Sequence, residues 1–186
     1  MTISTHWPTQ RSRRRRIPNS SAGLTIELGS AVGVARTSLA AFDAALGQLG
    51  VGDVNLIRLS SVIPPRSRLQ ISDRVYKPLG WGDRLYCVFA EQHATRVGQT
   101  AAAGIGWVRR DDGSGAGLFV EHEAPTEAEV VDLIERSLHD MTRARGGGFT
   151  PVEMHTTEAV CTGEPTCALV LAAYKATGWG AEVAVR

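Results

Sequence analysis

The stretch VNLIRLSSVIPP, residues 54–65, places two adjacent serines at the end of an apolar run and two prolines shortly after them. The run at 54–59 predicts a β-strand, and prolines so close behind it predict that the chain leaves the sheet there. Hydroxyl groups at a strand end often satisfy loose backbone groups. The residues alone therefore favour a structural role for Ser60 and Ser61, and leave a chemical role open.

Two amphipathic helices are predicted on either side of this stretch. The first begins at Thr37 or Ser38 and stops at Gly50, with apolar residues three and four positions apart. The second begins at a capping box, in which Thr126 is followed three residues later by Glu129. It ends at a run of three glycines, and its apolar positions are Val130, Leu133, Ile134, Leu138 and Met141.

Alternating or apolar runs predict further strands between and after the helices. Small residues at 97–110 suit a helix or a strand, and the interpretation adopted is a helical start that runs into a strand. Segment 66–80 is interpreted as a loop or a sheet edge, and 111–117 as a turn. The mixed order, without regular alternation, predicts an α+β fold. The other predicted strands are 24–28, 84–92, 118–123, 151–160 and 167–175.

Length and charge indicate a domain preceded by a basic arm. The 186 residues suit one domain, expected at 23–186, and the polar segment 1–22 is predicted to be disordered. Five arginines lie within residues 11–16, and without them the chain has 15 basic against 19 acidic residues, about −4. Such a body does not suit phosphate binding, so nucleic acid is not the expected partner.

The sequence predicts a cytoplasmic protein. It has no apolar run of the roughly 18 to 20 residues that a membrane span needs, and no export signal. Its three cysteines are too scattered for a disulfide framework or a zinc site, and reduced thiols are expected.

Other possible motifs carry less weight. The glycines at 113, 115 and 117 do not open a helix after a strand, so a hairpin turn is expected in place of a dinucleotide loop. The EHE triplet at 121–123 lacks further ligands, and no metal site is predicted. His93 and His155 are isolated in sequence and indicate no catalytic triad.

The stretch FDAALGQLGVGDVNLIRLSSVIPP, residues 42–65, closely resembles the pyruvoyl-dependent arginine decarboxylases. Weaker matches follow in VGQTAAAGI (97–105), GLFVEHE (117–123) and two closing strands, MHTTEAV (154–160) and CALVLAAYK (167–175). The resemblance runs from about residue 24 to 176. It implies a layered αββα-type sandwich and a trimer of αβ units, with active sites at the subunit interfaces.

The resemblance also implies a chemical role for the two serines. The chain would cut itself between Ser60 and Ser61, giving a β chain, 1–60, and an α chain, 61–186. Ser61 would become a covalent pyruvoyl group, which takes the part that pyridoxal takes in other decarboxylases. The implied reaction converts L-arginine to agmatine, a polyamine precursor, and carbon dioxide.

Four further roles follow from the same resemblance. Glu121 matches the family's proton donor, and it would need a raised pKa to hold its proton near neutral pH. Asp43 matches the aspartate that faces the guanidinium group, Asn55 matches a substrate-binding asparagine, and Ser60 adjoins the substrate. Glu123 suits cation recognition or a surface role equally.

Three alternatives remain open. The substrate could be ornithine, lysine or histidine, because the segment 66–92, which follows the pyruvoyl position, resembles the family poorly. The chain could be an uncleaved homologue that serves as a binding or regulatory subunit. The arginine-rich arm could also bind nucleic acid in a salt-dependent manner.

Overall fold

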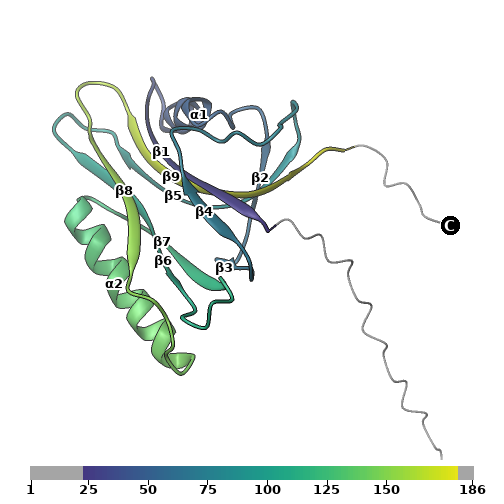
Figure 1. Ribbon diagram of the computed structural model, residues 1–186. Helices are drawn as coiled ribbons and strands as arrows, with labels where there is room; N and C mark the ends of the chain where they lie inside the picture. Colours follow the sequence, from purple (N-terminus) through teal and green to yellow (C-terminus); the bar gives the residue numbers. More distant parts are fainter. Residues whose placement is uncertain (1–22, 180–186) are drawn as a thin grey trace, which may run out of the picture.

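A computed structural model describes residues 23–179 and shows an α+β fold of strands and two helices in that range (Figure 1). The predicted α+β class is confirmed, whereas the trimer and the self-cleavage remain predictions. The basic arm and its predicted disorder lie outside the described residues. In chain order the elements are β1 (Thr25–Val34), α1 (Ser38–Gln48), β2 (Asn55–Arg58), β3 (Val62–Ile63), β4 (Arg68–Ile71), β5 (Arg84–Ala94), β6 (Thr100–Arg109), β7 (Gly117–Ala124), α2 (Glu127–Ala144), β8 (Glu153–Val160) and β9 (Thr166–Thr177).

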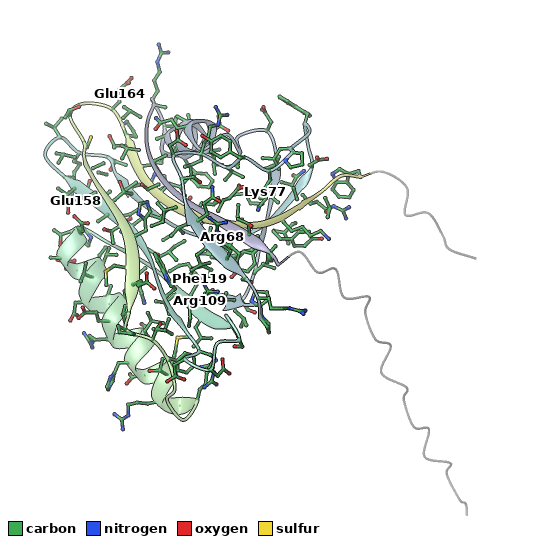
Figure 2. All side chains as sticks on the ribbon, viewed as in Figure 1. Arg68, Lys77, Arg109, Phe119, Glu158 and Glu164 are labelled. Carbon is green, nitrogen blue, oxygen red and sulfur yellow. The ribbon has the colours of Figure 1, made fainter. Side chains whose placement is uncertain are left out.

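The elements form four layers in the order helix, sheet, sheet, helix (Figure 1). One sheet has the order β2-β5-β9-β1-β4, and the other has the order β3-β7-β6-β8. Helix α1 packs on β1 and β9, and α2 packs on β6, β7 and β8. An apolar core fills the space between the sheets, where Phe119 lies fully buried among Trp107 and Tyr174 (Figure 2).

Capping residues set the helix starts as the sequence predicts. The hydroxyl of Thr37 accepts a hydrogen bond from the amide of Ala40, and that of Thr126 accepts one from Glu129. Within α1, however, Leu39 is 78% exposed, although its spacing placed it in the apolar stripe. The helix buries Ala41 and Ala45 together with Leu46, because Gly33 of β1 brings the backbones of strand and helix close together.

The predicted helical start within 97–110 is wrong, because Thr100–Arg109 is strand β6 throughout. Its small residues are explained by packing against α2. A Cβ atom added at Gly106 would lie 2.1 Å from Cγ2 of the buried Ile134, and one at Gly104 would lie 2.6 Å from Cγ1 of Val130. The small residues allow α2 to approach the sheet closely. Small residues are also common in helices, so the sequence pattern was misleading here.

Three further strands differ in how far they match the prediction. Strand β1 runs on to Val34, well past its predicted end, and β4 is an edge strand within the segment expected to be a loop or an edge. The two-residue strand β3 lies just beyond the two serines and was not predicted. Among residues 23–179, no helix is long and apolar enough to cross a membrane.

Candidate active site

The two serines lie where the chain passes from one sheet to the other. Strand β2 pairs in parallel with β5 in the five-stranded sheet, and the amide of Leu59 continues that ladder by donating to Cys87. Strand β3 pairs with β7 in the four-stranded sheet. The Ser60–Ser61 peptide therefore spans the crossing between the sheets.

Ser61 has a strained backbone. Its φ is 63°, in the left-handed region that a residue with a side chain occupies at a cost of about 1–3 kcal/mol. The carbonyl oxygen of Ser61 accepts a hydrogen bond of 2.8 Å from the amide of Phe119, and the hydroxyl of Tyr174 donates to the carbonyl of Val62 at 3.2 Å. Because Phe119 and Tyr174 are core residues from opposite sheets, both sheets hold this conformation in place.

Hydrogen bonds also hold the segment after the serines in place. The hydroxyl of Ser67 donates to the carbonyl of Pro64 at 2.7 Å, and the amide of Arg66 donates to Ser114 in the turn between β6 and β7. Arg66 also has a positive φ of 61°. A strained residue persists only when its surroundings overdetermine it, and these contacts supply that condition around Ser61.

Glu121 of β7 lies directly against Ser61. The hydroxyl of Ser61 donates to Oε2 of Glu121 at 2.7 Å, although the residues are 60 positions apart. The other carboxylate oxygen, Oε1, is buried and has no hydrogen-bond partner among the described residues. Burial raises the pKa of Glu121 above its ordinary value of 4.5, and the nearby charge of Glu123 adds to the rise.

Arg58 is a member of this cluster that the sequence analysis missed. Its guanidinium lies 4.5 Å from the ring centre of Phe89 and donates a hydrogen bond to the carbonyl of that residue. Its charge lowers the pKa of Glu121, as does the hydrogen bond from Ser61, and these effects oppose that of burial. The one available signal was its place on the strand that leads to the serines, where an arginine looks like an ordinary surface residue.

Asp43 and Asn55 belong to α1 and β2, which precede the crossing. Asn55 is the first residue of β2, six positions before Ser61, and an extended chain of that length spans as much as about 20 Å. Asp43 is exposed on α1 and lines a polar cavity of about 300 Å³ together with Asp53 and Arg74. No hydrogen bond or ion pair within 23–179 joins Asp43 or Asn55 to Ser61 or Glu121.

The remaining polar candidates lie at structural positions. Glu123 is exposed, and His122 points to the opposite face of β7, where its Nε2 lies 2.8 Å from Oγ of Ser137. His155 makes a 3.1 Å hydrogen bond with Ser30, from β8 to β1. The glycines at 113 and 115 have positive φ in the turn between β6 and β7, as a hairpin requires. Within the described residues, no three His, Cys, Asp or Glu side chains could hold a metal ion.

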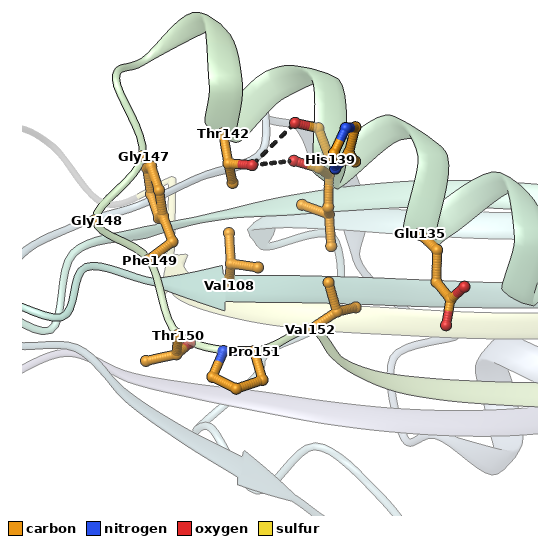
Figure 3. Close-up of a pocket in the computed structure, with 11 residues that line it drawn as sticks. Val108, Glu135, His139, Thr142, Gly147, Gly148, Phe149, Thr150, Pro151 and Val152 are labelled. Atoms are coloured by element: carbon orange, nitrogen blue, oxygen red, sulfur yellow. Dashed lines mark hydrogen bonds between the residues drawn. The ribbon is translucent and has the colours of Figure 1, made fainter.

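A separate pocket of about 370 Å³ lies between α2 and the segment 147–152 (Figure 3). Its lining includes Val108, His139 and Phe149, and shares no residue with the cluster around Ser61. The hydroxyl of Thr142 is already occupied, because it donates to helix carbonyls (Figure 3). The pocket therefore contributes nothing to the chemistry of the crossing.

Comparison with known proteins agrees with the resemblance in the sequence. Residues 25–177 match the model of a family described as pyruvoyl-dependent arginine decarboxylase. The chain belongs to this family. It is 36% identical over 146 residues to the pyruvoyl-dependent arginine decarboxylase of Halobacterium salinarum, covering 76% of this chain and 88% of the relative. The relative of that name from Methanopyrus kandleri is 37% identical over 130 residues, covering 69% and 81%.

A solved structure titled as a pyruvoyl-dependent histidine decarboxylase at pH 8 is similar with a TM-score of 0.42. Its sequence identity is 16%, and the match covers 74% of this chain and 62% of the other.

The residues at the crossing fit the pyruvoyl group that the family name specifies. Such a group is made from a serine, and Ser61 offers a hydroxyl in a strained backbone beside a carboxyl group. The unpartnered Oε1 of Glu121 leaves a buried polar atom beside residue 61 that a bound molecule can satisfy.

The strain at Ser61 gives a first prediction. Replacing Ser61 with Gly should leave the unprocessed chain roughly 1 kcal/mol more stable than replacing it with Ala, because glycine adopts positive φ without a steric penalty. Urea unfolding of both variants at one protein concentration measures the difference. As a control, Ser60→Gly and Ser60→Ala are compared in the Ser61→Ala background, where glycine should give no advantage. A Ser61→Gly protein no more stable than Ser61→Ala would contradict strain at this position.

Proposed function

We propose that this chain decarboxylates L-arginine to agmatine and carbon dioxide after cutting itself between Ser60 and Ser61. The observation that carries the proposal is the hydrogen bond from the strained Ser61 to the half-buried carboxyl of Glu121. The family name of the matching model and of the relatives supports the choice of reaction.

Self-cleavage begins with attack by Oγ of Ser61 on the carbonyl carbon of Ser60. The amide becomes an ester as the C–N bond breaks and the nitrogen of residue 61 gains the proton that the hydroxyl loses, while the hydrogen bond to Glu121 orients that hydroxyl. Loss of a proton from Cα of residue 61 then breaks the Cβ–O bond, which releases Ser60 as a carboxylate. Water converts the remaining unsaturated residue 61 into a ketone and ammonia. The products are the β chain, 1–60, and the α chain, 61–186, which begins with the pyruvoyl group.

In the decarboxylation itself, Glu121 acts as the proton donor. The pyruvoyl carbonyl supplies the acceptor for the electrons that carbon dioxide leaves behind. Because burial raises the pKa of Glu121, the side chain keeps its proton at a higher pH than an exposed carboxyl would. It can therefore deliver that proton to the substrate carbon that has lost its carboxylate.

The residues that hold the substrate come from a neighbouring copy of the chain. Asp43 and Asn55 are exposed, and no hydrogen bond or ion pair of the described residues joins either of them to Ser61. A trimer in which the α1 side of one subunit faces the crossing of the next would complete the site, and Ser60 at the crossing would border the substrate. Carboxylates such as that of Asp43 bind guanidinium groups through paired hydrogen bonds.

The acidic lining of the cavity beside α1 favours a substrate with a cationic side chain. Asp43 and Asp53 both border it, and the lining also includes Arg74. Arginine is preferred over ornithine, lysine and histidine because a planar guanidinium can donate two parallel hydrogen bonds to one carboxylate. An uncleaved binding or regulatory role remains the second function.

Two substitutions separate maturation from turnover. Ser61→Ala should remain one chain and release no carbon dioxide from L-arginine, because it lacks the attacking hydroxyl. Glu121→Gln should lose at least about 100-fold in kcat, the usual size of general-acid catalysis, while still yielding two fragments. Denaturing gels and carbon dioxide release measure the two steps, with the exposed Glu153→Gln as a matched control. Cleavage of Ser61→Ala, or full turnover by Glu121→Gln, would contradict these roles.

The charge of Arg58 gives a pH prediction. Because that charge lowers the pKa of Glu121, Arg58→Gln should raise it further. Activity that needs protonated Glu121 falls as the pH rises through this pKa, so the alkaline limb of kcat should move to higher pH in Arg58→Gln. Arg68→Gln, on the opposite edge strand of the same sheet, should leave the limb in place. A limb at the same or lower pH in Arg58→Gln would refute the assignment.

A further inference from the structure

The carbonyl of Gly82 holds two side chains at once. Nδ2 of Asn55 donates to it at 2.7 Å, and Nε1 of Trp179 donates to the same oxygen at 2.6 Å. Asn55 belongs to β2, whereas Trp179 follows the end of β9. One backbone oxygen therefore links a residue of the proposed substrate site to a tryptophan two positions beyond the segment that matches the family, which ends at residue 177.

The hydrogen bond to Gly82 decides which end of the Asn55 amide is available. Since the amino group is used as a donor to Gly82, the carbonyl oxygen Oδ1 is the atom left to meet a ligand. Guanidinium and ammonium groups are donors without acceptors, so they need an oxygen in that place. If the side-chain amide of Asn55 were reversed, its amino group would face the cationic group of the ligand, and two donors would meet.

Trp179 is 68% exposed and contacts Arg84. The guanidinium of Arg84 lies 4.5 Å from the centre of a Trp179 ring, and its Nη2 donates to the carbonyl of Gly178 at 2.6 Å. Arg84 is also the residue that pairs with Asn55 in the ladder between β2 and β5. These hydrogen bonds, the cation–π contact and the strand pairing link Asn55, Gly82, Trp179 and Arg84 in a ring that returns to β2.

The turn that carries Gly82 is also tied to β2. The amide of Asn55 donates to the carbonyl of Asp83, and the amide of Gly82 donates to that of Asp53, each at 2.7 Å. Gly82 has a φ of 77°, which glycine adopts without strain. These backbone bonds place the turn, and the indole of Trp179 approaches its carbonyl from the side of β9.

We propose that Trp179 is a positioning residue, which fixes the carbonyl of Gly82 and thereby orients Asn55 with Oδ1 toward the cationic substrate. The proposal rests on the proposed function, because it assigns Asn55 to substrate binding. Trp179 touches no reacting atom and acts through Asn55.

The test compares two tryptophans near the same turn. Trp179→Phe keeps an aromatic ring for Arg84 but loses the Nε1 donor. In the mature enzyme it should raise KM for L-arginine by about threefold to tenfold, the effect of one lost hydrogen bond, with kcat unchanged. Trp81→Phe, whose side chain is 88% exposed, should leave both constants unchanged. An unchanged KM in Trp179→Phe would overturn the proposal.

A double substitution tests whether Trp179 acts through Asn55. In an Asn55→Ala background, Trp179→Phe should cause no further rise in KM, because the group that it positions has been removed. If Trp179→Phe raises KM equally in both backgrounds, the tryptophan acts by another route and the proposal is wrong.

A second measurement does not depend on activity. The side-chain amide protons of Asn55, assigned by their loss in Asn55→Ala, should exchange with water faster in Trp179→Phe than in the parent or in Trp81→Phe. Unchanged exchange would overturn the positioning role. Faster exchange in a protein that does not decarboxylate arginine would support the positioning while refuting the proposed function, so the two failures are distinguishable.

Discussion

The backbone of Ser61 is held in a left-handed conformation by the two sheets that it joins. The carbonyl of Ser61 accepts a hydrogen bond from the amide of Phe119 in β7, and the carbonyl of Val62 accepts one from Tyr174 in β9. The turn therefore cannot relax unless core residues of both sheets move. The strain is therefore maintained by the same apolar packing that stabilises the fold. A strained peptide bond at this position needs such support, because an isolated loop would adopt a backbone conformation of lower energy.

The electrostatics of the crossing follow from its place between the sheets. Glu121 lies deep enough for burial to raise its pKa, while Arg58 and the hydroxyl of Ser61 act in the opposite direction. Because burial raises the pKa of Glu121, this carboxyl holds its proton to a higher pH than an exposed one would. The residues proposed to hold the substrate lie on α1 and at the start of β2, and in the proposed trimer a neighbouring subunit would bring them to this pair.

Local signals predicted the elements best. The capping threonines and the glycine after α1 set helix ends that the structure confirms, and alternation predicted strands such as β5 and β7. Local signals failed where packing decided. Strand β6 has small residues because α2 lies close to it, and Leu39 is exposed although its spacing suits the core.

The site was accessible from sequence only in part. The serine pair is visible in the chain, and the resemblance pointed to Glu121, but no periodic pattern brings residues 60 positions apart to within 2.7 Å. Arg58 was missed because its charge matters for the pKa of Glu121, a residue that only the fold brings near it. The link from Trp179 to Asn55 crosses 124 positions and could be seen only in three dimensions.

The most direct test of self-processing is the intact mass of the purified protein under denaturing conditions. The account predicts two fragments, 1–60 and 61–186, with the second lighter by one ammonia than a fragment that begins with serine. A single chain of 19.9 kDa that persists after incubation would contradict it.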